Sequence, residues 1–227
     1  RVAGYMPNRI ETIIAALGAA WIGAIWSSCS PDFGVQGVLD RFGQIEPKVL
    51  FACDGYQYNG KWIDLGERLQ TLREQLKPEL LVVIPGRGKA SNVHAALPWS
   101  EWLDAAGPAP AFAALPFDHP LYILYSSGTT GAPKLAELTQ RNLAAGAIMA
   151  ASALGWREND RILTGLPLFH VGGSVDMLLS GIAAGATLMF PTALGLRNPE
   201  VISRFWPLVD ETRATLVGGV PTMLSAM

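Results

Sequence analysis

The sequence predicts an α/β protein with two α/β subdomains, each built on a mostly parallel sheet flanked by helices. Short apolar segments typical of strands alternate with segments of helical periodicity along the whole chain. Hydrophobic residues make up 50% and charged residues 16% of the 227 residues, a composition typical of a globular domain with a sizeable core. Buried strands separated by helices of this length form parallel sheets through right-handed crossovers.

The first 120 residues are expected to form the first subdomain and a polar connection. Pro7 and Asn8 mark a helix start, Ser30 and Asp32 can cap a second helix, and Pro47 ends that helix. The expected order is strand 2–5, helix 10–22, strand 24–28, helix 33–45, strand 49–53, helix 62–75 and strand 80–84. Residues 86–120 are polar and rich in proline, which predicts a connection without a core of its own.

Residues 121–227 are expected to form a glycine-rich loop and a second subdomain, because the alternation of strands and helices resumes there. The expected order is helix 139–154, strand 161–164, helix 172–184, strand 187–190, helix 199–212 and strand 214–218. The chain opens inside a strand and stops within a helix that starts at Pro221, so we expect a fragment of a longer protein.

Composition argues against several classes of function. The net charge is −2 and no block of lysine or arginine is present, so we expect no nucleic-acid partner. Each apolar run is shorter than the roughly 20 residues of a membrane span, which predicts no transmembrane segment. Cys29 and Cys53 have no metal-ligand spacing and are expected to be reduced thiols of a cytoplasmic protein. We assign no residue as a metal ligand.

The segment 122–134, Y-I-L-Y-S-S-G-T-T-G-A-P-K, joins an apolar strand to a loop of glycine and hydroxyl residues that ends in a lysine. Small residues let the backbone approach an anion, hydroxyls donate to phosphate oxygens, and the lysine adds a positive charge. The segment therefore predicts a polyphosphate site, with ATP as the expected ligand. The residues assigned to it are Ser126, Ser127, Gly128, Thr129, Thr130, Gly131 and Lys134.

Other phosphate-binding motifs do not fit this segment. A Walker A loop requires serine or threonine after the lysine, whereas Leu135 follows Lys134. Gly86 and Gly88 do not continue as a dinucleotide-binding fingerprint. A polar surface turn is the alternative for a short cluster of this composition, but the length of the strand, loop and lysine together disfavours it.

The match S-S-G-T-T-G-x-P-K at 126–134 resembles the phosphate-loop signature of the adenylate-forming superfamily, which includes acyl-CoA synthetases. The resemblance implies that a carboxylate attacks the α-phosphate of ATP to give an acyl-adenylate and pyrophosphate. A thiol, usually that of coenzyme A, then takes the acyl group. Mg²⁺ bridging the phosphates is expected on charge grounds, and Glu137 is expected on the exit strand rather than at the metal.

A second segment, L-P-L-F-H-V-G-G at 166–173, resembles the acyl-CoA synthetase signature that precedes a helix lining the acyl pocket. The resemblance places His170 beside the attacking carboxylate, with Val171 and Gly172 next to it, and assigns catalytic roles to Lys134 and His170. The alternative for His170 is a hydrogen-bonded core or helix-entry histidine.

A third segment resembles the strand and turn that form the floor of the acyl and adenine pocket. It comprises Gly218, Gly219, Val220 and Pro221. Glycines at the carboxyl end of a strand let a flat or narrow ligand approach. Taken alone, the segment is better explained as a simple strand-to-helix turn.

Within the superfamily, the resemblance divides the chain. Residues 1–133, and 26–48 above all, resemble acetoacetyl-CoA synthetase, whereas residues from Lys134 onward are more similar to medium- or long-chain fatty acyl-CoA synthetases. This split suggests the hypothesis that two synthetase genes are joined at their shared phosphate loop. It leaves the substrate, acetoacetate or a fatty acid, open.

The resemblance identifies the chain as part of the amino-terminal domain of an ATP-dependent carboxylate-CoA ligase of fatty-acid or lipid metabolism. The expected partners are a small-molecule carboxylate, ATP, coenzyme A and the missing carboxy-terminal portion. The family's later motifs are absent from the 227 residues, so we expect no catalysis from the fragment alone. Two alternatives remain: an inert nucleotide-binding fragment, or an adenylation domain serving a carrier protein.

Overall fold

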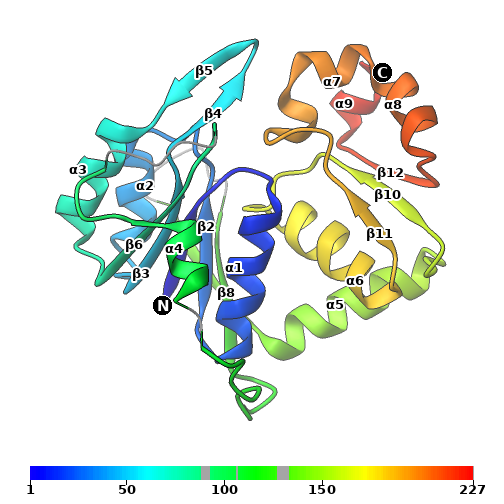
Figure 1. The fold of residues 1–227 in the computed structure, drawn as a ribbon. Helices are drawn as coiled ribbons and strands as arrows, with labels where there is room; N and C mark the ends of the chain where they lie inside the picture. Colours follow the sequence, from blue (N-terminus) through cyan, green and yellow to red (C-terminus); the bar gives the residue numbers. More distant parts are fainter. Residues whose placement is uncertain (88–92, 106, 127–132, 227) are drawn as a thin grey trace. The chain divides into compact units, whose positions relative to one another are not determined.

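The structure is a computed structural model that describes residues 1–87, 93–105, 107–126 and 133–226. It has the mixed α/β architecture expected from the sequence, with mostly parallel strands flanked by helices (Figure 1). Two compact units are present: Arg1–Tyr56 with Trp62–Thr139, and Gln57–Lys61 with Gln140–Met227. The strands on either side of the glycine-rich loop thus belong to the first unit, and the predicted domain boundary at residue 120 remains a prediction.

Within the described residues, the first unit contains a seven-stranded sheet of order β7-β6-β3-β1-β2-β8-β9. The strands are β1 (Val2–Tyr5), β2 (Trp26–Cys29), β3 (Val49–Cys53), β6 (Leu80–Ile84), β7 (Leu97–Pro98), β8 (Pro120–Tyr125) and β9 (Leu135–Thr139). All neighbours pair in parallel except β8 and β9, which are antiparallel. All four residues of β1 are buried, because this strand lies between β3 and β2.

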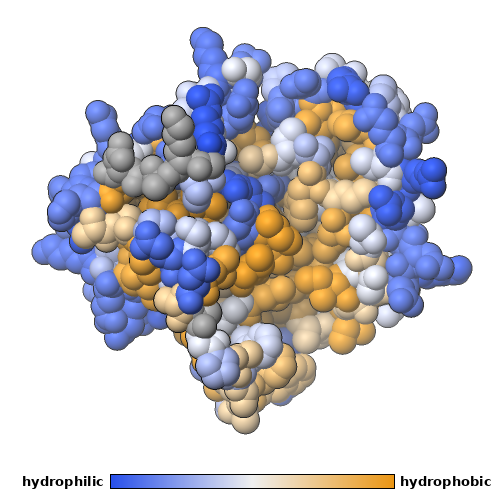
Figure 2. Space-filling view, viewed as in Figure 1, coloured by the Kyte–Doolittle hydropathy of each residue, from blue (hydrophilic) through white to orange (hydrophobic). Residues whose placement is uncertain are grey.

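Helices cover both faces of this sheet (Figure 1). They are α1 (Ile10–Trp21), α2 (Val35–Phe42), α3 (Gly66–Leu76) and α4 (Trp99–Asp104). The helices α2 and α3 pack against each other and bury Phe42 and Leu72 completely. Along α1, Ile10, Ile14 and Leu17 remain exposed, and apolar residues are visible on this face of the molecule (Figure 2).

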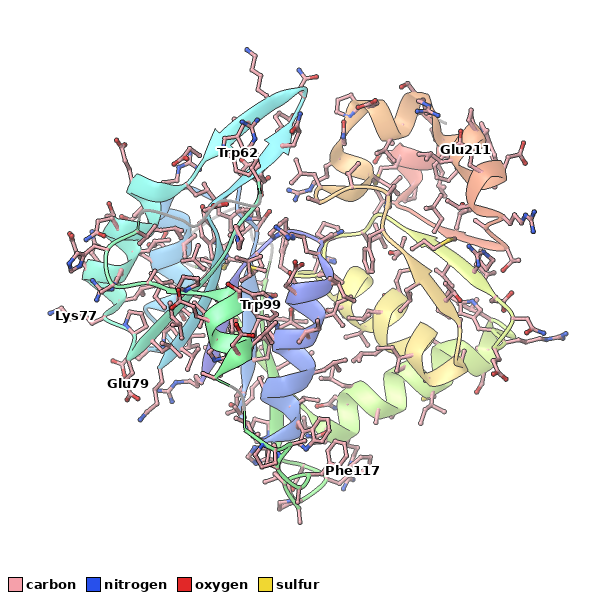
Figure 3. All side chains as sticks on the ribbon, in the orientation of Figure 1. Trp62, Lys77, Glu79, Trp99, Phe117 and Glu211 are labelled. Carbon is pink, nitrogen blue, oxygen red and sulfur yellow. The ribbon has the colours of Figure 1, made fainter. Side chains whose placement is uncertain are left out.

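The predicted helix 62–75 is wrong at its start. Residues Lys61–Asp64 form β5, which pairs with β4 (Gly55–Tyr58), and α3 begins only at Gly66. The connecting residues Asn59 and Gly60 have φ values of 48° and 73°, as a tight hairpin turn requires. The sequence Asn59-Gly60 is therefore the signal for a hairpin that the predicted helix overlooked. The Arg87 guanidinium lies 4.5 Å from the ring centroid of Trp62, a residue of β5 that is labelled in Figure 3.

The polar connection 86–120 contains more structure than predicted, namely β7 and α4. Trp99 and Trp102 stand three positions apart on α4, and their rings lie 6.0 and 5.2 Å from that of Phe51 (Figure 3). Phe51 is only 4% exposed, so α4 covers a core residue of β3. Trp99 and Trp102, one helical turn apart, therefore indicate a helix that the overall polarity of residues 86–120 conceals.

The second unit contains a parallel three-stranded sheet of order β11-β10-β12 within its described residues. Its strands are β10 (Arg161–Thr164), β11 (Thr187–Met189) and β12 (Leu216–Gly218). Its helices are α5 (Gln140–Ala153), the π-helix η1 (Gly172–Leu179), α6 (Ser180–Ala184), the 3-10 helix η2 (Gly195–Arg197), α7 (Pro199–Ser203), α8 (Phe205–Thr212) and α9 (Pro221–Leu224). Leu163, Leu196, Val201 and Phe205 form its buried core cluster.

Two predicted helices of this unit are each divided in the structure. The helix predicted at 199–212 breaks at Arg204, whose φ is −110°. The cause is Pro207, which has no N–H and whose ring clashes with the carbonyl of residue 203 in a continuous helix. The helix predicted at 172–184 begins as η1 and becomes α-helical only at Ser180. Among the described residues, no helix is long and apolar enough to cross a membrane.

Candidate functional site

The glycine-rich loop connects β8 to β9 in the first unit. Ser127, Gly128, Thr129, Thr130 and Gly131 lie outside the described residues, whereas Ser126 and Lys134 lie within them. The N–H of Ser126 donates to the carbonyl of Lys134 at 2.8 Å, and the N–H of Lys134 donates to the Ser126 hydroxyl at 3.2 Å. Ser126 and Lys134 thus add one more pair to the antiparallel pairing of β8 with β9, next to Tyr125 and Leu135. The two ends of the loop are therefore fixed to each other.

The strand that enters the loop is tied to the sheet by buried hydroxyl groups. Ser27 of β2 donates to the carbonyl of Ile123 at 2.8 Å, and the hydroxyls of Ser28 and Tyr122 lie 2.6 Å apart. Hydrogen bonds between buried polar groups hold one geometry, because a group left without its bond is costly. The loop thus starts from a rigid strand, and both Ser126 and Lys134 are exposed at its ends.

Two contacts on the stems of the loop were not expected from the sequence. The Tyr125 hydroxyl donates to the carbonyl of Arg41, and the Gln44 side-chain amide donates to the carbonyl of Pro133. Burial raises the pKa of the Tyr125 phenol to about 12, so it remains a donor at neutral pH. No sequence pattern signals these contacts, because Arg41 and Tyr125 are 84 positions apart in the chain.

His170 lies in the second unit, at the end of the turn that leads into η1. Its Nδ1 accepts the N–H of Gly172 at 3.2 Å, and its carbonyl accepts the N–H groups of Gly173 at 3.0 Å and Ser174 at 2.9 Å. With Nδ1 as the acceptor, a neutral imidazole carries its proton on Nε2. The side chain is exposed, as is that of Val171, so His170 stands at a helix entry and not in the core.

The predicted pocket floor also lies in the second unit, where β12 ends and α9 begins. Gly218 pairs with Thr164 of β10, and a Cβ added to Gly218 would lie 2.6 Å from the Met177 sulfur on η1. A larger residue at this position would therefore require the flexible Met177 side chain to shift. Gly219 follows in the turn, Val220 is the N-cap of α9, and Pro221 is its first residue. The structure thus gives these residues a packing role whatever they bind.

The described residues contain no group of three or more histidine, cysteine or acidic side chains that could hold a metal ion. Glu137 is exposed on β9, as expected for a residue of the exit strand. Cys29 and Cys53 are buried free thiols, and burial raises the pKa of each to about 12. Both are therefore protonated at neutral pH, where a thiol is a poor nucleophile.

Comparisons with known proteins give a consistent result. The model of the AMP-binding enzyme family matches residues 1–227. The chain is 43% identical over 200 residues to acetoacetyl-coenzyme A synthetase from Rhizobium meliloti strain 1021, covering 83% of this chain and 29% of that protein. It is 38% identical over 242 residues to acetoacetyl-CoA synthetase from Mus musculus, covering 100% of this chain and 35% of that protein.

Among solved structures, acetoacetyl-CoA synthetase from Streptomyces lividans matches with a TM-score of 0.82 and 35% identity, over 100% of this chain and 34% of that chain. The chain spans about a third of the length of these relatives. The matches run through both halves of the chain, and the predicted similarity of the second half to fatty acyl-CoA synthetases is not shown. This chain belongs to the AMP-binding enzyme family, the adenylate-forming enzymes expected from its glycine-rich loop.

Proposed function

We propose that this chain supplies the phosphate loop and part of the acyl site of an ATP-dependent carboxylate-CoA ligase, with acetoacetate as its substrate. The proposal is carried by the hairpin of β8 and β9, which fixes Ser126 and Lys134 at the two ends of the family's loop signature. Acetoacetate is favoured over a fatty acid because the named relatives, which match through both halves of the chain, are acetoacetyl-CoA synthetases.

In the first step, a carboxylate oxygen of acetoacetate attacks the α-phosphorus of ATP. The bond between the α-phosphorus and the bridging oxygen breaks, and pyrophosphate leaves with the electron pair. Lys134 and the loop hydroxyls bind the β- and γ-phosphates, hold them in line, and neutralise the charge that develops on the leaving group. In the second step, the thiol of coenzyme A attacks the acyl carbon, AMP leaves, and the thiol proton is released.

His170 is the residue we assign to the carboxylate. Its Nδ1 accepts the N–H of Gly172, so the Nε2–H of this exposed side chain can donate to a carboxylate oxygen. A hydrogen bond from Nε2 orients the attacking oxygen and remains in place while the acyl-adenylate forms. Val171 and Gly172 at the same helix entry, together with residues 218–221 at the end of β12, would line the acyl and adenine pocket.

Mg²⁺ enters this proposal as the partner of the triphosphate. The described residues offer no acidic cluster for a resident ion, so its ligands are expected to be mainly phosphate oxygens and water. When bound, Mg²⁺ would neutralise part of the negative charge of the phosphates. No step above depends on a protein ligand to the metal. We also place the reaction in the cytoplasm, since Cys29 and Cys53 are unpaired thiols.

Carboxylate-dependent exchange of labelled pyrophosphate into ATP tests the proposal. Because the chain spans a third of its relatives, residues 1–227 would replace the matching third of the Streptomyces lividans enzyme. We expect exchange with acetoacetate to exceed that with octanoate or palmitate. A ligase of normal stability that exchanges pyrophosphate with neither class of acid would refute the proposal, and preference for the fatty acids would refute its choice of substrate.

For the 227-residue chain by itself, we propose nucleotide binding without turnover, because two thirds of the relatives' length lies outside it. Calorimetric titration with ATP and Mg²⁺ tests this. The chain should release heat that saturates with ATP but give no carboxylate-dependent exchange. An adenylation domain serving a carrier protein would instead transfer its acyl group to a phosphopantetheine-bearing protein, and coenzyme A would not replace that acceptor.

A further inference from the structure

The carboxyl-terminal end of α2 contacts both stems of the phosphate loop. Tyr125, the last residue of β8, donates its hydroxyl to the carbonyl of Arg41 at 2.8 Å. On the other stem, the Gln44 side-chain amide donates to the carbonyl of Pro133 at 3.0 Å. The residues immediately before Ser126 and immediately before Lys134 are thus tied to one helix end. All of these residues belong to the first compact unit.

The helix end and the loop stems depend on each other chemically. The last carbonyls of a helix have no partner within the helix and need donors from elsewhere. The Arg41 carbonyl accepts the Tyr125 hydroxyl as well as the backbone N–H of Gln44 at 3.1 Å, and the Gln44 side-chain amide donates to the Asp40 carbonyl at 2.6 Å. Both hydrogens of the Gln44 amide are therefore used, one on Asp40 and one on Pro133. Displacing the first stem would break the bond of Tyr125 to Arg41, and displacing the second would break the bond of Gln44 to Pro133.

The Arg41 side chain strengthens this connection. Its guanidinium lies 4.8 Å from the ring centroid of Phe33 and 5.9 Å from that of Tyr125, and it donates to the carbonyl of Gly37 at 2.7 Å. A guanidinium over an aromatic face is attracted by the ring quadrupole. The Tyr125 ring is thus held through its face as well as through its hydroxyl, and the incoming stem has one defined position.

We infer that Gln44 and Tyr125 are positioning residues that set where the phosphate loop begins and ends, and through it the affinity for the ATP triphosphate. This inference rests on the proposed function. Neither residue contacts the reacting atoms, since each acts on the backbone of a stem. Fixing the two ends of the loop reduces the conformational freedom that is lost when the triphosphate binds, so loosening either stem weakens ATP binding.

Two substitutions and a matched control test the inference in the ligase that carries residues 1–227. Gln44→Ala removes the bond to Pro133, and Tyr125→Phe removes only the hydroxyl. Gln36→Ala is the control, because Gln36 is, like Gln44, an exposed glutamine, but it lies within α2 and its amide donates to the Asp40 carboxylate at 2.6 Å. Each test variant should raise the KM for ATP roughly 2- to 10-fold, the worth of one hydrogen bond. The KM for acetoacetate should not change, and Gln36→Ala should leave both values unchanged.

A second measurement needs no activity. In the substrate-free 227-residue chain, the Ser126 amide is protected by its bond to Lys134. Its hydrogen exchange, followed by NMR, should be several-fold faster in Gln44→Ala and Tyr125→Phe than in Gln36→Ala. Equal exchange in all three variants would overturn the inference, as would an active ligase whose KM for ATP is the same in all three. If the unsubstituted ligase is inactive, the proposed function fails, and amide exchange still decides the role of α2.

Discussion

The N–H of Ser126 donates to the carbonyl of Lys134 at 2.8 Å, so the first and last residues of the glycine-rich loop are paired across its base. The Lys134 side chain therefore starts from a fixed backbone position although it is exposed to solvent. A lysine whose backbone is held in place before the ligand arrives has less freedom to lose when its charge meets a developing anion. This pairing makes Lys134 the side chain on which ATP binding should depend most.

Lys134→Ala should weaken ATP binding to the 227-residue chain roughly 10- to 100-fold, the effect of losing a hydrogen bond to a charged group. Calorimetric titration with ATP and Mg²⁺ measures it. Lys48→Ala is the control, because Lys48 is an exposed lysine whose ion pair with Glu79 is on the surface and contributes little. If the two variants bind ATP equally well, Lys134 does not hold the triphosphate.

His170→Ala should lower kcat/KM for acetoacetate by at least about 10-fold, because the carboxylate loses its orienting donor. The KM for ATP should be unchanged, and the melting temperature nearly so, since the side chain is exposed and gives up one hydrogen bond, that from the Gly172 N–H. His94→Ala, another exposed histidine, is the control. A simple helix-entry role predicts the opposite result, namely normal kinetics with a lower melting temperature.

Stability should fall at alkaline pH because of the buried thiols. Burial raises the pKa of Cys53 from 9.0 to about 12, so the fold favours the protonated form. Below pH 9 this contribution is fully present. Between about pH 9 and 12 the unfolded chain ionises first, and the free energy of unfolding falls by up to about 1.4 kcal/mol per pH unit for each such group.

Urea midpoints measured under reducing conditions across this range test the effect. Cys53→Ala should remove the contribution of one proton and make the decline less steep. Burial also raises the pKa values of Cys29, Tyr5 and Tyr125 to about 12, so these groups maintain the remaining decline. An unchanged slope in Cys53→Ala would show that Cys53 does not ionise on unfolding, and the burial described above would then be wrong.

Phe205→Ala should destabilise the second unit by about 3 to 5 kcal/mol, because it leaves a cavity among Leu163, Leu196 and Val201. Phe205 is 2% exposed, whereas the adjacent Trp206 is 60% exposed. Trp206→Ala should therefore cost only about 1 kcal/mol, mainly its edge contact with the Phe205 ring. Urea unfolding of the two variants gives the comparison, and equal losses would contradict the assigned core.

Strands were the part of the fold best predicted from the sequence. The strands 2–5, 49–53, 80–84 and 161–164 lie at the expected positions, because short buried apolar runs leave little choice of structure. The β4–β5 hairpin was missed because Trp62 continues the helical spacing of Leu65, Leu69 and Leu72. The break at Arg204 was missed because Pro207 acts on the turn before it.

The candidate site was predictable only where one short segment carries the chemistry. Ser126 and Lys134 belong to one contiguous motif, so both ends of the loop could be named before the structure. The contacts of Tyr125 with Arg41 and of Gln44 with Pro133 join residues more than 80 positions apart, and only the folded sheet brings them together. The joining of two synthetase genes at the loop remains a hypothesis, which a long sequencing read across the codons for residues 126–134 tests.

A crystal structure of the 227-residue chain with Mg²⁺ and a non-hydrolysable ATP analogue tests the central claim most directly. The account predicts that the β- and γ-phosphates lie inside the loop 126–134, with the Lys134 Nζ within about 3 Å of a phosphate oxygen. A nucleotide bound with its triphosphate elsewhere, or a loop filled by its own side chains while the analogue occupies another site, would contradict it.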